Sequence, residues 1–207
     1  MTSPASSGSN RKIIYSLAVS LDGFINGPNG EIDWHVVDSE FMNFIHAQVK
    51  EVDTFLFGRR MYETMVYWDT AADDPSLTSD AREFAHRWNQ QLKIVFSNSL
   101  DQVQGNARLA STTLEGEVER LKSIPGGDIE ISGATLAAQA MALDLIDEYR
   151  MFLTPVLLGG GTRYFPESGP GFPLERTGFH QFTSGVTYLQ YSRTGSEAHN
   201  ASTVRQS

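Results

Sequence analysis

The sequence contains no cysteine, which removes disulfide bonds, thiolate nucleophiles and cysteine-based zinc sites from the chemistry open to the protein. Basic residues are also scarce: 16 lysines and arginines stand against 25 acidic residues, for a formal net charge of −9. A nucleic-acid surface needs clustered basic side chains that neutralise phosphates, so this balance argues against a nucleic-acid partner. A small anionic ligand is still allowed, because it requires only a local positive pocket.

Long apolar runs are missing as well. No uninterrupted apolar run approaches the roughly 20 residues of a membrane-spanning helix, and the N-terminus lacks the apolar core of a signal peptide. We therefore expect a cytoplasmic protein without membrane contacts. The histidines show no metal-ligand spacing such as HExxH, and we predict no metal site. They are His35, His46, His86, His180 and His199.

Hydrophobic residues make up 40% of the 207 residues, which is enough for one sizeable core. Residues 1–10 and 195–207 are small and polar, and they cannot bury enough apolar area to offset the entropy of ordering. We therefore predict two disordered tails around one folded domain, residues 11–194, which has no long linker and no internal repeat.

Short β-rich runs alternate with segments of helical periodicity throughout this domain. The pattern predicts strands over 12–20, 54–58, 93–97, 107–110, 128–132 and from 148 onward, and helices over 38–49, 60–66, 79–92, 113–124 and 134–143. Asp38 is the expected N-cap of the first helix. Residues 179–182 and 186–193 predict a closing hairpin. Helices between strands imply crossover connections, so we expect an α/β fold: a mainly parallel sheet, helices on both faces and an antiparallel hairpin at one edge.

Polar and glycine-rich sequences follow several of the predicted strands. They are Asp22-Gly23, Gly58-Arg59-Arg60, Ser97-Asn98-Ser99, Ser132-Gly133-Ala134-Thr135 and Gly159-Gly160-Gly161-Thr162-Arg163. Ligands of open α/β sheets bind at the carboxyl ends of the strands. Each sequence alone is also typical of an ordinary turn or a solvated charge. Their recurrence at one edge favours a nucleotide ligand, although neither GxGxxG nor a P-loop motif is present.

Longer segments around these strand ends form a further pattern. They read YSLAVSLDGFINGPNGEIDW, DTFLFGRRMYE, KIVFSNSL, IEISGATLAAQAM and FLTPVLLGGGTRYFP. In this order they resemble the dihydrofolate reductase-like family, and within it the reductase domain of the deaminase/reductase of bacterial riboflavin biosynthesis. The resemblance spans about residues 12–193. It implies a three-layer dihydrofolate reductase-like fold and a stand-alone, NADPH-dependent reductase that acts on a small heterocyclic substrate.

The resemblance implies that three strand ends contact the phosphates of NADPH. The implied cofactor residues are Gly58, Arg59 and Arg60 at the phosphates, Ser97 and Asn98 at the adenosine 2′-phosphate, and Gly133, Ala134, Thr135 and Leu136 at the pyrophosphate. Two adjacent arginines favour NADPH over NADH, because a guanidinium matches the additional phosphate. A bound anion would also relieve the repulsion between Arg59 and Arg60, so we expect cofactor binding to weaken as salt rises.

The nicotinamide and the substrate are implied to lie between the first and sixth strand ends. The residues implied there are Ala18, Asp22, Gly23, Trp34, Gly160, Thr162 and Arg163. Asp22 is the first candidate for a catalytic role, as a proton relay or a substrate hydrogen-bond partner. Trp34 could stack on a flat heterocycle, although tryptophans are more often plain core residues. Arg163 would hold a substrate phosphate, although an arginine beside a glycine turn is more often simply exposed.

Departures from the family pattern bear on the substrate. Met61 stands where dihydrofolate reductases usually have a threonine, and neither Asp38 nor Glu40 matches their pocket carboxylate. The expected substrate is therefore a ribosylamino-pyrimidine, as for 5-amino-6-(5-phosphoribosylamino)uracil reductase. The alternatives are a dihydrofolate or pterin reductase, a non-catalytic nucleotide-binding protein with the same fold, or a flavin-dependent enzyme. Relatives commonly form homodimers, and the Tyr188/Tyr191 hairpin is one potential dimer face.

Overall fold

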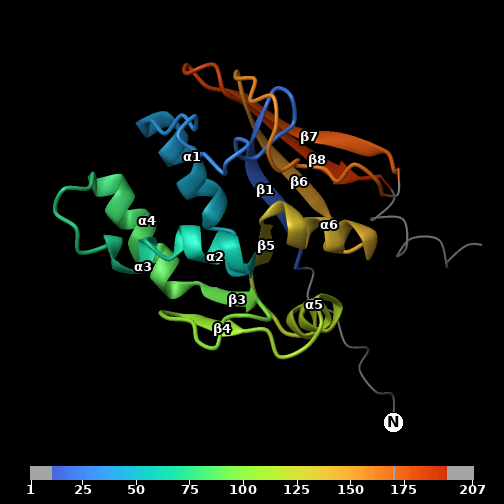
Figure 1. Cartoon of the computed structure of the whole chain (residues 1–207). Helices are drawn as coiled ribbons and strands as arrows, with labels where there is room; N and C mark the ends of the chain where they lie inside the picture. Colours follow the sequence, from blue (N-terminus) through green and yellow to red (C-terminus); the bar gives the residue numbers. More distant parts are fainter. Residues whose placement is uncertain (1–10, 170, 195–207) are drawn as a thin grey trace, which may run out of the picture.

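The computed structural model describes residues 11–169 and 171–194, and the tails predicted over 1–10 and 195–207 lie outside them. At its centre is an eight-stranded sheet in the order β4-β3-β2-β5-β1-β6-β8-β7 (Figure 1). The strands are β1 (Ile13–Ser20), β2 (Val52–Gly58), β3 (Leu92–Phe96), β4 (Ala107–Leu109), β5 (Asp128–Ser132), β6 (Glu148–Thr154), β7 (Leu174–Gln181) and β8 (Thr187–Arg193). All pairs among β1 to β6 are parallel, and β8 pairs antiparallel with both β6 and β7. The predicted sheet and its closing hairpin are confirmed.

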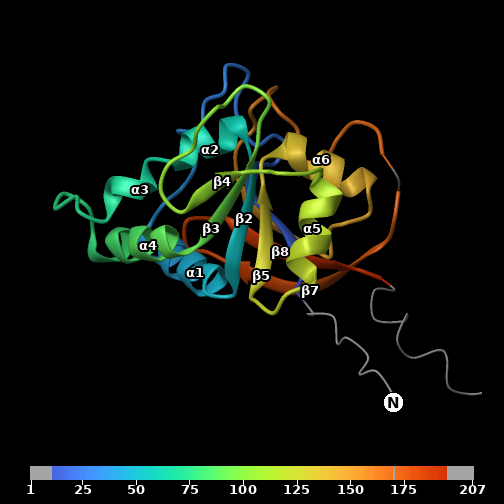
Figure 2. The ribbon, with the colours of Figure 1, turned by 90° about the horizontal axis from the view of Figure 1, so that it is seen from below.

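Helices cover both faces of this sheet. They are α1 (Ser39–Val49), α2 (Arg59–Met65), α3 (Trp68–Ala71), α4 (Ser79–Gln90), α5 (Leu114–Lys122) and α6 (Ala134–Ala142). Figure 2 shows α1 and α4 on one side of the sheet, and α5 and α6 on the other. Asp38 caps α1 by accepting a hydrogen bond from the Phe41 N–H at 2.8 Å, as predicted. Within the described part of the chain, no helix has the length and apolar character needed to cross a membrane.

A separate hydrophobic core fills each side of the sheet. On one side, Val118 of α5 and Leu136 of α6 cluster with Ile131 and other buried residues of the central strands. On the other side, Trp88 of α4 packs against Phe55 of β2, with ring centroids 5.4 Å apart. Each fully buried apolar side chain contributes about 1.5–3 kcal/mol relative to an exposed one, so these two cores hold the helices on the sheet.

The chain leaves neighbouring strands toward opposite faces of the sheet. The segments after β1 and β2 run to α1 and α4 on one face, whereas those after β4 and β5 run to α5 and α6 on the other. Open α/β sheets bind their ligands outside the carboxyl ends of the strands where such a switch occurs. The predicted ligand-binding sequences therefore lie along this edge, in the spatial order of β3, β2, β5, β1 and β6.

Some details of the helices and the hairpin differ from the sequence-based expectation. The four-residue helix α3 was not predicted, because so short a helix has no periodicity to read. Tyr188 is only 2% exposed and lies against Phe44 of α1, so Tyr188 itself is not available to a partner, while Tyr191 is partly buried. The homodimer stays a prediction.

Glu117 of α5 carries a carboxylate inside the core. Its side chain is fully buried and accepts hydrogen bonds from the Arg108 guanidinium at 2.6 and 2.9 Å and from the Ser111 N–H at 2.8 Å. The hydrogen bonds from Arg108 are the main reason that the pKa of Glu117 falls to about 2. This pair joins β4 to α5.

Folding lowers the pKa of Glu117, so the pair stabilises the fold above the ordinary value of 4.5 and this contribution is lost as pH falls toward 2. We expect Glu117→Gln to lower the free energy of unfolding at pH 7 by roughly 2–3 kcal/mol, less than for a pair buried on both sides. The variant should also lose part of the acid dependence. Urea unfolding at pH 7 and pH 3 measures both effects. The exposed Glu115→Gln is the control, and an unchanged acid dependence in Glu117→Gln would contradict this account.

Candidate functional site

The loop after β1 is tied to the loop after β6 through Asp22. Its carboxylate accepts hydrogen bonds from the Gly159 N–H at 2.7 Å and the Leu158 N–H at 3.1 Å, and the Ser20 hydroxyl donates to it at 2.6 Å. These bonds, led by that from Ser20, lower the pKa of Asp22 to about 2. Asp22 is therefore ionised near neutral pH, and the geometry favours a loop anchor over a proton donor. Its catalytic role stays a prediction.

Further contacts join the same two loops. The Asn26 side-chain oxygen accepts from the Thr162 N–H at 2.8 Å, and the Ile25 N–H donates to the Thr162 carbonyl at 2.8 Å. Gly161 has a φ of +126°, and a Cβ at this position would overlap the Asn26 carbonyl. Only glycine allows so close an approach. Thr162 is therefore held in a fixed position relative to the first loop.

Tyr15 and Tyr164 attach these loops to the sheet. The Tyr15 hydroxyl donates to the Tyr164 carbonyl at 3.1 Å, while the Tyr164 hydroxyl donates to the carbonyls of Tyr15 and Arg150 at 3.1 and 3.2 Å. The two ring centroids are 4.3 Å apart. Burial raises the pKa of both phenols, so both remain hydrogen-bond donors. The segment that carries Thr162 and Arg163 is thus anchored to β1 and β6 of the sheet.

Arg59 links the end of β2 to the turn after β3. Its Nε donates to the Glu63 carboxylate at 2.7 Å, and its Nη1 donates to the Ser99 hydroxyl at 2.9 Å. Arg60 is exposed and has no side-chain hydrogen bond or ion pair among the described residues. The negative charge of Glu63 therefore already reduces the predicted repulsion between Arg59 and Arg60. The Arg60 guanidinium is available to bind an anion.

The turn after β3 is closed by Ser97. Its hydroxyl accepts hydrogen bonds from the N–H groups of Ser99 and Leu100 at 3.2 and 3.0 Å, and Asn98 is exposed beside it. Ser99, rather than Ser97 or Asn98, is the residue of this turn that contacts Arg59. Sequence reasoning named Ser99 within this turn but gave the cofactor contact to Ser97 and Asn98, because the contact with Arg59 joins two strand ends that are distant in the chain.

Gly133 brings the start of α6 against α2. It has a φ of +107°, and a Cβ at this position would lie 3.3 Å from the Met61 Cβ. Met61, which stands where dihydrofolate reductases usually have a threonine, therefore packs between two helix starts. Within residues 11–169 and 171–194, no side chain caps the N-terminus of α6, so the N–H groups of its first turn are available to an anion.

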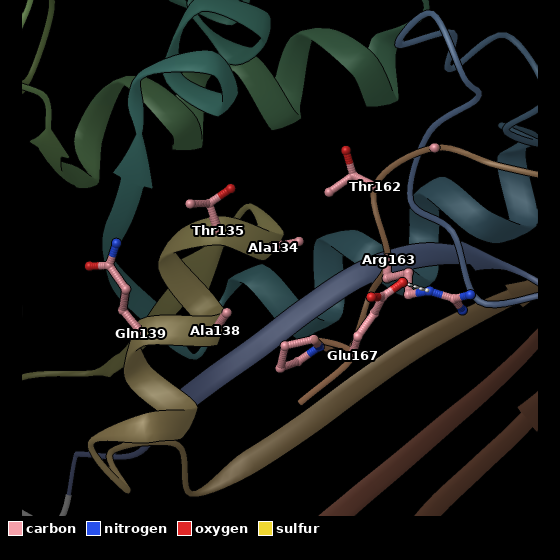
Figure 3. A pocket seen from close by; sticks show the side chains of 9 residues that line it. Ala134, Thr135, Ala138, Gln139, Thr162, Arg163 and Glu167 are labelled. Atoms are coloured by element: carbon pink, nitrogen blue, oxygen red, sulfur yellow. Dashed lines mark hydrogen bonds and ion pairs between the residues drawn. The ribbon is translucent and has the colours of Figure 1, made fainter. Parts of the chain in front are cut away.

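A pocket of about 470 Å³ opens between α6 and the loop after β6 (Figure 3). It is lined by Ala134, Thr135, Ala138, Gln139, Gly161, Thr162, Arg163, Pro166 and Glu167. The pocket brings together predicted pyrophosphate and substrate residues, including Thr135 and Thr162. Arg163 forms an ion pair with Glu167 at 3.3 Å and lies over the Phe24 ring at 4.9 Å.

Other predicted residues do not line this pocket. Ala18 packs toward the aromatic cluster of Phe152 and Phe182. Trp34 is half-buried, its indole N–H donates to the Glu31 carbonyl at 3.2 Å, and its ring meets His35 edge-on. Stacking of Trp34 on a substrate stays a prediction.

Glu130 of β5 is a titratable residue that the sequence analysis did not identify as a candidate. Its carboxylate accepts a hydrogen bond at 3.0 Å from Ser132, the last residue of β5. Burial raises the pKa of Glu130 to about 7, against the opposing effects of Ser132 and Arg150. A carboxylate on a central strand that helices cover on both faces is unusual. The presence of a glutamate within β5 was therefore the sequence signal that could have identified Glu130.

Comparison with known proteins adds the following findings. A family model described as the RibD C-terminal domain matches residues 11–188. Two uncharacterized proteins of Bacillus subtilis (strain 168) are similar. YyaP is 33% identical over 188 residues, which cover 89% of this chain and 96% of the relative. YwjB is 31% identical over 186 residues, which cover 88% and 98%.

Solved structures agree in fold. A putative riboflavin biosynthesis protein from Shewanella sp. PV-4 aligns with a TM-score of 0.67 and 25% identity, over 88% of this chain and 98% of that chain. Dihydrofolate reductase from Enterococcus faecalis, complexed with NADP(H), aligns with a TM-score of 0.60 and 16% identity, over 90% and 99%. At 16% identity the second likeness concerns the fold alone.

Tyr164→Phe tests the anchoring of the loop after β6. It removes the donor to two buried carbonyls and keeps the ring, so we expect a loss of about 1–2 kcal/mol in the free energy of unfolding. Hydrogen exchange at the Thr162 and Tyr164 amides should become faster. The exposed Tyr67→Phe is the matched control. Equal stability and equal exchange in the two variants would show that the hydroxyl does not anchor the loop.

Proposed function

Because the chain belongs to the RibD C-terminal domain family, we propose that it is an NADPH-dependent reductase that transfers a hydride to a small heterocyclic substrate. One observation carries the proposal: the strand ends that resemble the family's cofactor site are physically joined at one edge. Arg59 contacts Ser99, Gly133 approaches Met61, and the pocket unites the start of α6 with the loop after β6.

The residues at this edge fit the phosphates of a dinucleotide. Gly133 lacks a Cβ, and among the described residues the start of α6 has no side-chain cap and the Arg60 guanidinium has no partner. NADPH would supply the hydride when bound. Gly58, Arg59, Arg60, Ser97 and Ser99 would hold its phosphates together with the first turn of α6.

The substrate is proposed to be a ribosylamino-pyrimidine, like that of 5-amino-6-(5-phosphoribosylamino)uracil reductase. Family membership and Arg163 in the pocket support this choice. A dihydrofolate or pterin reductase is the second candidate, supported by the fold. It is disfavoured because Asp38 caps α1, while Glu40 accepts hydrogen bonds from Thr183 at 2.6 and 3.0 Å. Both carboxylates are thus already engaged within the chain.

Reduction of a C=N or C=O bond consumes one proton together with the hydride. We propose Glu130 as the proton source, because its carboxylate hydrogen-bonds to Ser132 at the end of β5 and burial raises its pKa to about 7. Asp22 suits this task less well, because its carboxylate is already bound by two N–H groups and one hydroxyl.

NADPH titration followed by fluorescence tests the cofactor. We expect saturable binding, about tenfold weaker in Arg59→Ala and in Arg60→Ala, and weaker for all forms as salt rises. Arg176→Ala is the control, because Arg176 is an exposed arginine on β7. The absence of saturable binding below millimolar NADPH would rule the proposal out.

Glu130→Gln tests the proton source in turnover assays with a panel of pyrimidine, pterin and carbonyl substrates. We expect kcat to fall about 10²–10⁴-fold while NADPH affinity is retained. Because the protonated form donates, wild-type kcat should decline as pH rises through about 7, and the variant should lack this decline. Unchanged kcat would exclude Glu130. NADPH binding without wild-type turnover would instead favour the non-catalytic alternative.

A further inference from the structure

Glu63 lies one helical turn after Arg59 in α2, and the two side chains form an ion pair at 2.7 Å. Both are open to solvent, with 51% of the Arg59 side chain and 45% of the Glu63 side chain exposed. An exposed pair at this spacing stabilises a helix only slightly. The core contacts of α2 come from Tyr62, Met61 and Met65 instead. Glu63 is therefore not needed to fold this segment.

The pair constrains how Arg59 can bind an anion. A guanidinium has five N–H donors, and the structure uses Nε for Glu63 and one Nη1 hydrogen for Ser99. The remaining donors are left for a phosphate. A phosphate on those donors would share one guanidinium with the Glu63 carboxylate, and the two anions would repel each other.

We propose that Glu63 is a specificity-determining residue that limits the affinity of the hydrogen-bonded pair Arg59 and Ser99 for the cofactor phosphate. This inference rests on the proposed use of NADPH. The carboxylate orients Arg59 toward Ser99, and its charge at the same time weakens phosphate binding. As a consequence, Arg59 is already oriented toward Ser99 before the cofactor binds, and the oxidised cofactor can still be released.

The position of Ser99 decides which phosphate is affected. Ser99 belongs to the turn after β3, where the family resemblance implies the 2′-phosphate of the adenosine. NADH lacks this group. Glu63 therefore lowers the affinity for NADPH and leaves the affinity for NADH unchanged, which reduces the discrimination between the two nucleotides.

Titration of the full chain with NADPH and with NADH separates these effects. Glu63→Gln keeps an oxygen acceptor for the Arg59 Nε and removes the charge. We expect it to bind NADPH about three- to tenfold more tightly at low ionic strength, with a smaller gain at high salt. Its NADH affinity should not change. Glu63→Ala should gain less, because Arg59 loses its alignment.

Glu83→Gln is the control, since Glu83 is an exposed carboxylate of α4. Thermal unfolding checks that each variant is folded. Unchanged or weaker NADPH binding by Glu63→Gln would overturn the inference, as would an equal gain for NADH. If neither nucleotide binds to any form, the proposed cofactor use itself fails; binding by the wild type with no effect of Glu63→Gln refutes the role of Glu63 alone.

Discussion

The geometry of the candidate site depends on the carboxylate of Asp22, which binds the loop after β6 through the N–H groups of Leu158 and Gly159. Parallel neighbouring strands end at the same edge, but strand pairing alone does not position the loops that follow them. Asp22 joins them, and the Tyr15–Tyr164 pair fixes them to the sheet. Thr162 and Arg163 consequently line the pocket beside the start of α6, and the Arg163 guanidinium points away from α6 to its ion pair with Glu167. The negative charge of Asp22 thus fixes the geometry on the side of the candidate site that is proposed to bind the substrate.

The side of the candidate site that is proposed to bind the cofactor is held together by close packing and by charge. Gly133 lets the start of α6 approach Met61, so the anion-attracting ends of two helices come close together. The arginines add positive charge in a chain whose net charge is −9. In such a protein, the proposed recognition of phosphate must be local. The ion pair with Glu63 partly offsets even the local positive charge of Arg59.

The sequence was sufficient for most of the fold, because strand and helix periodicities and the Asp38 cap are local signals. It placed the start of β7 at Phe179, whereas the strand begins at Leu174: charged residues and the irregular pairing near Gly178 hide its alternation. The strand-end residues were also predictable. The partners of Arg59, the raised pKa of Glu130 and the hydrogen bonds of Asp22 were not predictable, since each depends on contacts that the local sequence pattern does not reveal.

The central claim is that one edge of the sheet binds NADPH through several strand ends at once. Backbone amide chemical shifts recorded during NADPH titration test it most directly. We predict saturable shifts confined to the strand ends at 58–61, 97–99, 133–136 and 160–163. Shifts that do not saturate, or that appear on β7 and β8 while these strand ends stay unchanged, would contradict the claim.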